Sequence, residues 1–109
     1  MNTFGLSTND LSAINKVFSN YKNIEKVLIY GSRAKGNYKP FSDIDITLLG
    51  NTIDLTLQHQ IENDLDALLL PYKFDITIFK KLNNPEFIDH INRVGIPFYE
   101  KITNHKNSN

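Results

Sequence analysis

Apolar residues recur along this chain at two spacings, one typical of helices and the other typical of strands. A first helix is predicted from Ser7, as its N-cap, to about Asn20, because an acidic residue, Asp10, follows Ser7 by three positions. The apolar residues of this segment recur every three or four positions: Leu11, Ile14, Phe18 and Tyr21. This spacing indicates an amphipathic helix with one buried face.

Short runs of strand-forming residues supply the rest of a sheet. Strands are predicted at residues 26–30, 43–49 and 73–79, where apolar and β-branched residues are concentrated. A final short strand is predicted at residues 96–99. Because Pro97 cannot donate a hydrogen bond to a strand ladder, this last strand is expected at an edge of the sheet.

Two further helices separate these strands. The first is expected to begin around Thr52 to Asp54 and to stop before Pro71. The second begins at Asn84-Pro85, since proline suits the first helical position, and it ends at Gly95. The residues assigned to the buried side of these helices are Leu57, Ile61, Leu65, Leu68, Leu69, Leu70, Phe87, Ile88 and Ile91.

The order of elements predicts the fold class but not the strand order. Helix, strand, strand, helix, strand, helix, strand is typical of an α/β (α+β) domain of two layers, with a mixed β-sheet and helices on one side. The 109 residues are expected to form one domain over residues 1–103, followed by a disordered polar tail at residues 104–109.

Charge and composition exclude several classes of partner. The net charge is zero and the isoelectric point is near 6.8, so no direct binding of nucleic acid through an extended basic surface is expected. Cysteine is absent, which excludes disulfides. No secretion signal and no apolar run of membrane-spanning length is found, so no membrane partner and a cytoplasmic location are expected.

The loop after the first predicted strand has features of an anion site. Gly31 would let a ligand approach the backbone closely, and Ser32 adds a small hydroxyl. Residues 32–35 would form one helical turn stopped by Gly36, and the N–H groups at such a turn bind anions. An ordinary strand-to-turn junction explains this loop equally well, and the GxxxxGK[ST] spacing of a P-loop is absent.

Two aspartates at the start of the next strand would share one face of the sheet. Asp43 and Asp45 are separated by one residue, a step of roughly 6.6 Å along a strand, while Ile44 would face the core. Carboxylate oxygens are the ligands that Mg²⁺ prefers, and two such charges repel each other unless a cation lies between them. Taken alone, this pair is better explained as a solvated strand face or a loop-capping aspartate, because two aspartates at this spacing are common.

A third carboxylate favours the metal interpretation. Asp75 lies in a similar apolar run, and it would join Asp43 and Asp45 if the two strands were neighbours. Three carboxylates at one place can hold two divalent ions about 3.5–4 Å apart, the arrangement used for in-line displacement at phosphorus.

Together the loop and the carboxylates resemble a known family. Gly31-Ser32, ten residues and then Asp43-Ile44-Asp45 is similar to the signature of the nucleotidyltransferase superfamily of DNA polymerase beta. The fuller form, GSRAKG followed by SDIDI, resembles the minimal nucleotidyltransferase (MNT) group, small domains often encoded beside a HEPN-domain partner. The resemblance extends over roughly residues 7–100.

The resemblance implies a role for each candidate residue. Gly31 and Ser32 would contact the phosphates of a nucleoside triphosphate, taken to be ATP, and Arg33 would help to neutralise their charge. The metal ligands and catalytic residues would be three aspartates that hold Mg²⁺, as two ions: Asp43, Asp45 and Asp75. The implied fold is the mixed sheet of the polymerase beta-like nucleotidyltransferases.

The acceptor of the nucleotide is not determined by these residues. Similarity to MNT antitoxins implies transfer of AMP to a tyrosine of a partner HEPN toxin. One alternative is a small-molecule nucleotidyltransferase subunit that a helical partner chain completes. Another is a non-catalytic antitoxin that binds nucleotide or blocks its partner.

Overall fold

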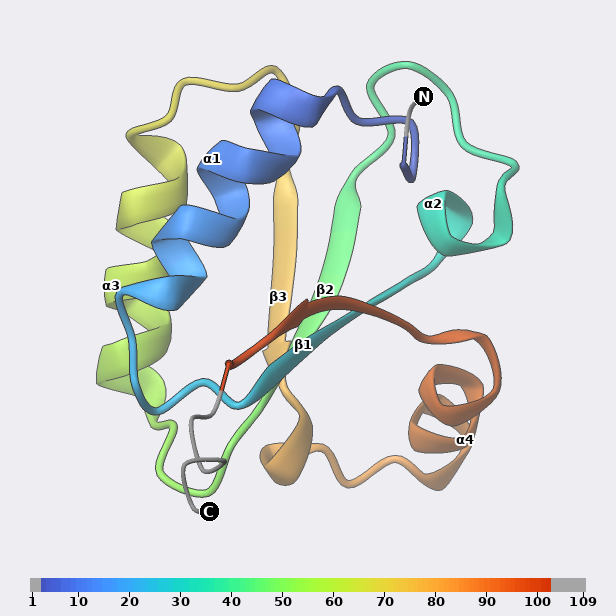
Figure 1. The fold of residues 1–109 in the computed structure, drawn as a ribbon. Helices are drawn as coiled ribbons and strands as arrows, with labels where there is room; N and C mark the ends of the chain where they lie inside the picture. The colour runs from blue at the N-terminus through green and yellow to red at the C-terminus, as the bar shows by residue number, and fades with distance from the viewer. Residues whose placement is uncertain (1–2, 103–109) are drawn as a thin grey trace, which may run out of the picture.

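A mixed four-stranded sheet with the order β3-β2-β1-β4 is the centre of the fold in the computed structural model (Figure 1). Strand β1 (Lys26–Tyr30) pairs antiparallel with β2 (Ile44–Leu49) on one side and with β4 (Ile96–Glu100) on the other. Strand β3 (Phe74–Ile78) pairs parallel with β2. The expected mixed sheet is confirmed, and β4 lies at an edge, as Pro97 predicted.

The structure describes residues 3–102, so the predicted tail at residues 104–109 lies outside the described part of the chain. The helical segments are α1 (Thr8–Ser19), α2 (Ser32–Lys35), α3 (Leu55–Asp66), a 3-10 turn η1 (Phe79–Lys81) and α4 (Pro85–Val94). Within residues 3–102, no helix has the length and apolar character needed to cross a membrane.

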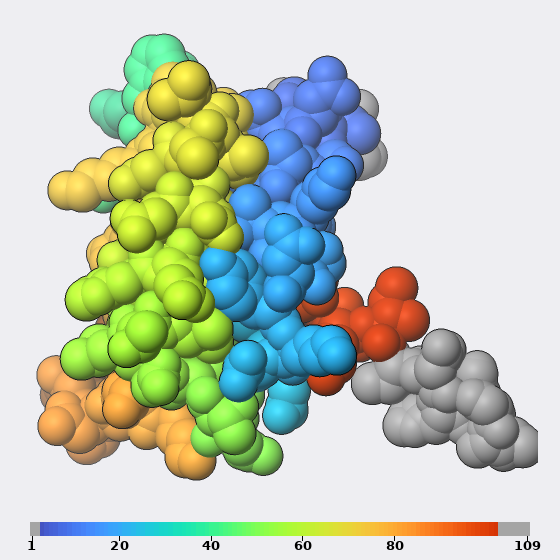
Figure 2. Space-filling view, turned by 90° about the vertical axis from the view of Figure 1, so that its left-hand side faces the viewer, coloured from blue at the N-terminus to red at the C-terminus, as the bar shows by residue number. Residues whose placement is uncertain are grey.

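Helices α1 and α3 cover one face of the sheet and form the core with it. Figures 1 and 2 show the two helices side by side. Alternate residues of each strand point toward them, and β2 contributes Ile44, Ile46 and Leu48, all fully buried. From the helices, Ile14, Phe18 and Ile61 are also fully buried. Ser7 caps α1 as predicted, because its hydroxyl accepts from the Asp10 N–H at 3.1 Å.

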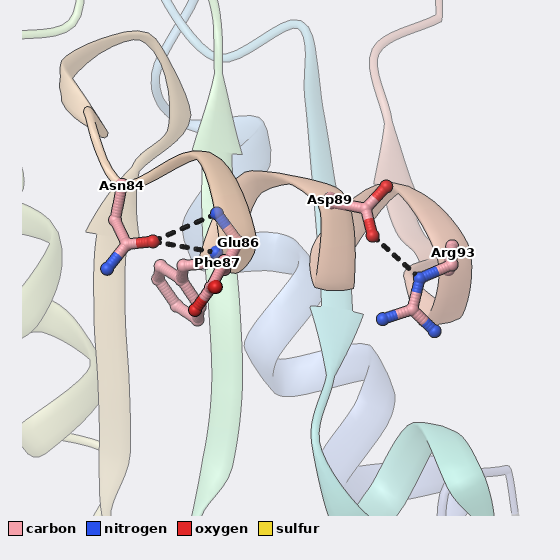
Figure 3. Close-up of polar contacts among 5 residues, drawn as sticks. All are labelled: Asn84, Glu86, Phe87, Asp89 and Arg93. Carbon is pink, nitrogen blue, oxygen red and sulfur yellow. Dashed lines mark hydrogen bonds and ion pairs between the residues drawn. The ribbon is translucent and has the colours of Figure 1, made fainter.

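Helix α4 lies against the opposite face. The Tyr30 ring, which projects from that face of β1, lies 5.5 Å from the Phe87 ring and 6.4 Å from the His90 ring. In Figure 3 the Asn84 side chain accepts hydrogen bonds from the Glu86 and Phe87 N–H groups, which confirms the predicted start of this helix. The expected one-sided arrangement therefore describes α1 and α3, and α4 adds partial cover on the second face.

Helix α3 is shorter than the sequence pattern predicts. It ends at Asp66, and the N–H groups of Leu68 and Leu69 bond to carbonyls three residues back, which tightens the turn. Leu69 adopts a left-handed backbone with φ +57° and is 87% exposed, so its assignment to the core was wrong. The following Leu70-Pro71 pair disfavours further helix, because the residue before a proline avoids helical angles.

Candidate active site

The sheet register places two of the predicted carboxylates side by side. Asp45 of β2 and Asp75 of β3 are direct partners in the parallel ladder. Asp43 lies two residues before Asp45, immediately ahead of β2, so an extended chain directs both to the face opposite the core. The structure thus pairs Asp45 with Asp75 at the beginning of two parallel strands, and Asp43 lies just ahead of Asp45 in sequence.

These carboxylates influence one another electrostatically. Partial burial raises the pKa of Asp45 above its usual value, and the negative charges of Asp75 and then Asp43 act in the same direction. The ionised form of Asp45 is therefore disfavoured in the protein alone. A bound cation would reverse this effect, since it stabilises the charged carboxylates.

The donor set suits a hard divalent cation, although it is not closed around one. Every candidate ligand is a carboxylate oxygen, the type that Mg²⁺ prefers. Within residues 3–102, no three histidine, cysteine, aspartate or glutamate side chains converge closely enough to hold an ion as they stand. Like charges keep carboxylates apart, and Asp43 and Asp75 are exposed, so their side chains are not fixed by packing.

Gly31 lies directly against Asp45. Its backbone has φ +77° and ψ −157°, a conformation that is essentially restricted to glycine. A Cβ at this position would collide with the Asp45 carboxylate. Ser32 then begins α2, and Gly36 ends it in a left-handed conformation with φ +89°, which confirms the predicted single helical turn. The first N–H groups of such a turn have no partner within the helix.

Arg33 is not directed toward the carboxylates. Its side chain is 2% exposed, and its guanidinium donates to three backbone carbonyls, those of Phe4, Pro40 and Ser42, at 2.9–3.1 Å. The predicted contact of Arg33 with phosphate therefore has no support in this geometry. A basic residue in a loop looks the same in sequence whether it faces solvent or the interior, so its burial could not be predicted.

Tyr30 belongs to this site although sequence reasoning did not assign it. It is paired with Asp45 in the antiparallel ladder, so Tyr30, Asp45 and Asp75 form one row across three strands. Burial raises the pKa of Tyr30, and this outweighs the opposite effect of Thr77, while the charges of Asp75 and Asp45 also raise it. The phenol therefore stays neutral at physiological pH. The position of Tyr30 directly before Gly31 was the sequence feature that could have assigned it to the site.

Two of the three carboxylates, those of Asp43 and Asp75, are exposed, whereas Asp45 is partly buried. A cavity of about 520 Å³ is found at the other end of β2, where Leu49, Phe79 and Ile88 are among its lining residues. None of the three aspartates lines it.

Comparison with known proteins identifies the family. The family model described as "Polymerase beta, Nucleotidyltransferase" matches residues 12–104. None of the curated proteins matches the chain at a significant level.

Solved structures share the fold at low sequence identity. A chain of a toxin–antitoxin crystal structure with AMP-PNP superposes with a TM-score of 0.66 at 18% identity, covering 94% of this chain and 79% of that one. A chain from the complex of tri-AMPylated Shewanella oneidensis HEPN toxin with MNT antitoxin gives 0.62 at 17% identity, with coverage of 92% and 76%. A nucleotidyltransferase structure from Sulfolobus solfataricus, described there as putative, gives 0.50 at 20%, with coverage of 83% and 76%.

The family model covers most of the chain, and the elements that carry its motifs lie at one end of one sheet. Gly31 contacts Asp45, and Asp45 is paired with Asp75. The solved structures compared above share this fold. The chain is a nucleotidyltransferase and belongs to the polymerase beta nucleotidyltransferase family.

Proposed function

We propose that this chain transfers AMP from ATP to a tyrosine hydroxyl of a partner HEPN-domain protein, in a reaction that depends on Mg²⁺. The observation that carries the proposal is the grouping of Asp43, Asp45 and Asp75 beside Gly31 in a chain of this family. Phosphoryl chemistry of this type needs charge neutralisation and positioning more than covalent participation by the protein.

Each element of the site has a role in this reaction. Gly31 and Ser32 bind the phosphates, because the glycine lets the backbone approach them and the start of α2 offers N–H groups. Asp43 and Asp45 would hold Mg²⁺, with Asp75 as a further carboxylate. When bound, the metal would neutralise phosphate charge and polarise the bond to be broken.

The chemical step exchanges the phosphoanhydride bond between the α- and β-phosphates of ATP for a phosphoester bond to the tyrosine. The tyrosine oxygen attacks the α-phosphorus in line, the bond from that phosphorus to the bridging oxygen breaks, and pyrophosphate leaves with the electron pair. Asp75 is exposed at the start of β3, where it can accept the proton that the hydroxyl loses. The product is a tyrosine–AMP phosphodiester.

A protein acceptor is compatible with the exposure of two of the three aspartates. Asp43 and Asp75 are exposed, so a bulky acceptor can reach their carboxylates. Related folds occur in complexes with HEPN toxins, one of which is AMPylated. We therefore expect a partner chain to carry the acceptor.

A transfer assay tests this proposal directly. The purified chain is incubated with α-labelled ATP, Mg²⁺ and a HEPN-domain protein from the same genome, and label on protein is followed by gel and intact mass. The proposal predicts a mass gain of one or more AMP groups on the partner, which EDTA prevents. The double variant Asp43→Asn/Asp45→Asn is the matched control and should give no label.

The other outcomes point to different functions. A blocking antitoxin would form a tight complex with the partner without labelling it. In that case the double variant would still neutralise the partner. Label on small hydroxyl compounds, with none on the partner, would indicate a small-molecule nucleotidyltransferase subunit. Either result would overturn the proposed protein acceptor.

A further inference from the structure

Arg33 is a buried charge without an acidic partner in the described part of the chain. It is 2% exposed, and the ion pairs found within residues 3–102 are Lys26–Glu100 and Arg93–Asp89. Burial of an isolated charge is costly unless hydrogen bonds compensate for the lost water. Three carbonyl oxygens and two aromatic rings provide that compensation here: the guanidinium carbon lies 4.8 Å from the Tyr72 ring centre and 5.2 Å from that of Tyr38.

The hydrogen bonds of Arg33 close the loop between the two halves of the family signature. Ten residues separate Ser32 from Asp43, and Arg33 is the first of them while Ser42 is the last. Arg33 Nε donates to the Ser42 carbonyl at 3.0 Å, so the first and last residues of this spacer are joined directly. A second donor reaches the Pro40 carbonyl at 3.1 Å.

The third donor extends the same network to the N-terminal segment. It reaches the Phe4 carbonyl at 2.9 Å, on a turn in which Gly5 lies against the Tyr38 ring and the Arg33 side chain. A Cβ on Gly5 would overlap the Tyr38 ring. The guanidinium therefore holds together two chain segments that are far apart in sequence.

This network fixes the backbone on one side of Asp43, and the sheet fixes it on the other. The Ser42 carbonyl, in the peptide group that precedes Asp43, accepts from Arg33. The N–H of Ile44, in the peptide group that follows, donates to the Lys73 carbonyl at 2.8 Å. The Asp43 side chain is exposed, so packing does not hold it in place. These two backbone contacts therefore determine the position of the Asp43 Cα atom, from which the carboxylate extends.

We propose that Arg33 is a positioning residue that sets Asp43 in place for metal binding, an inference that rests on the proposed function. Arg33 does not touch phosphate or metal in this role. It acts through the Ser42–Asp43 peptide group, which keeps Asp43 within reach of the site shared with Asp45. Lysine cannot replace it, because a single ammonium lacks the planar fork that serves three carbonyls between two rings.

Metal binding by the free chain gives a test that does not depend on the transfer reaction. Mn²⁺ is used as the probe, and its binding to the wild type and to Arg33→Lys is measured by electron paramagnetic resonance with and without a non-hydrolysable ATP analogue. Loss of an outer-shell contact typically weakens metal affinity 10–100-fold, so we expect at least about a tenfold loss in Arg33→Lys. Amide exchange at Ile44, whose N–H donates to the Lys73 carbonyl, should become faster in the same variant.

A stability-matched control separates positioning from general destabilisation. Val17→Ala removes core volume from α1, away from the loop, and should lower the melting temperature without changing Mn²⁺ affinity. If Arg33→Lys does not fold, Tyr72→Leu loosens the same network by removing one ring while all three hydrogen bonds remain. It should then weaken Mn²⁺ binding more than Val17→Ala does.

The outcomes distinguish the positioning role of Arg33 from the proposed function of the chain. The positioning role would be overturned if folded Arg33→Lys bound Mn²⁺ with the affinity of the wild type. If only Tyr72→Leu folds, the same result in that variant would overturn it. Either result would leave the proposed function intact. A wild-type chain that binds neither Mn²⁺ nor the nucleotide would overturn the proposed function itself. Equal losses in Val17→Ala and in the loop variants would show that the effect is one of stability alone.

Discussion

The two faces of strand β2 carry out different tasks with alternate residues of the same six-residue segment. Ile44, Ile46 and Leu48 are fully buried against the layer formed by α1 and α3. Asp45 points to the other face, where it is half-buried and accompanied by Asp75 from β3. Because side chains alternate along a strand, one segment can stabilise the fold and present charges to a ligand.

The difference between the faces concerns how each residue is held. Core residues are fixed by close packing of their own side chains. Asp45 is held by its backbone, since β1 and β3 pair with it on both sides. Substitutions on the core face should therefore lower stability, and substitutions on the site face should instead reduce nucleotide transfer.

The largest expected effect lies on the core face. Ile46→Ala should lower the free energy of unfolding by about 2–5 kcal/mol, because it removes apolar contacts and leaves a cavity. Denaturant titration measures this loss. Leu55→Ala is the control: Leu55 is 58% exposed, and its substitution should change stability by less than about 0.5 kcal/mol. Equal effects of the two variants would contradict the assigned core.

The second largest effect is expected on the site face, where a substitution should reduce transfer without reducing stability. Asp45→Asn should reduce transfer about 10²–10³-fold, the range found when a group that stabilises the transition state is removed. Its melting temperature without metal should be unchanged or higher, because burial and neighbouring charges already disfavour the ionised carboxylate. Calorimetry beside the transfer assay measures both, and a large drop in melting temperature would indicate a structural role for Asp45.

A substitution of Gly31 should affect both stability and transfer, and Gly36 provides a matched control. Gly31→Ala should cost about 1–3 kcal/mol and also reduce transfer, because its backbone angles and the nearby Asp45 carboxylate both exclude a Cβ. Gly36 also has positive φ, but a Cβ there meets no atom within 4 Å. Gly36→Ala should cost about 1–2 kcal/mol from the left-handed backbone alone and retain transfer. Loss of transfer in both variants would remove the distinction.

The smallest effect is a pH dependence of stability. Folding raises the Asp45 pKa above its ordinary value of 3.8, so the folded chain binds this proton more tightly than the unfolded chain. The free energy of unfolding should therefore fall as the pH rises from about that value through the folded pKa, and acid should restore it.

Mg²⁺ should offset this loss at neutral pH and have little effect in acid, where the carboxylates are protonated. Melting curves of the wild type and Asp45→Asn, with and without Mg²⁺, measure the difference. Asp45→Asn should lack this contribution to the pH dependence. A wild-type stability that rises over the same interval, relative to the variant, would contradict the assigned direction.

The sequence predicted the elements and their faces well wherever the local pattern was strong. Ser7 and Asn84 cap helices as predicted, because their side chains bond to nearby backbone groups and need no tertiary context. The end of α3 was misjudged at Leu69, since an apolar side chain was assumed to be buried. Its exposure follows from a tight turn that the leucine-rich pattern does not reveal.

The sequence by itself determined the alternation of apolar and acidic residues in β2, the glycines that flank α2, and the family signature. These are local properties, set by strand period and backbone angles. Only the tertiary structure decided that β3 lies beside β2, which pairs Asp75 with Asp45, and that Arg33 faces the interior. Both depend on contacts between residues distant in sequence, which local preferences do not determine.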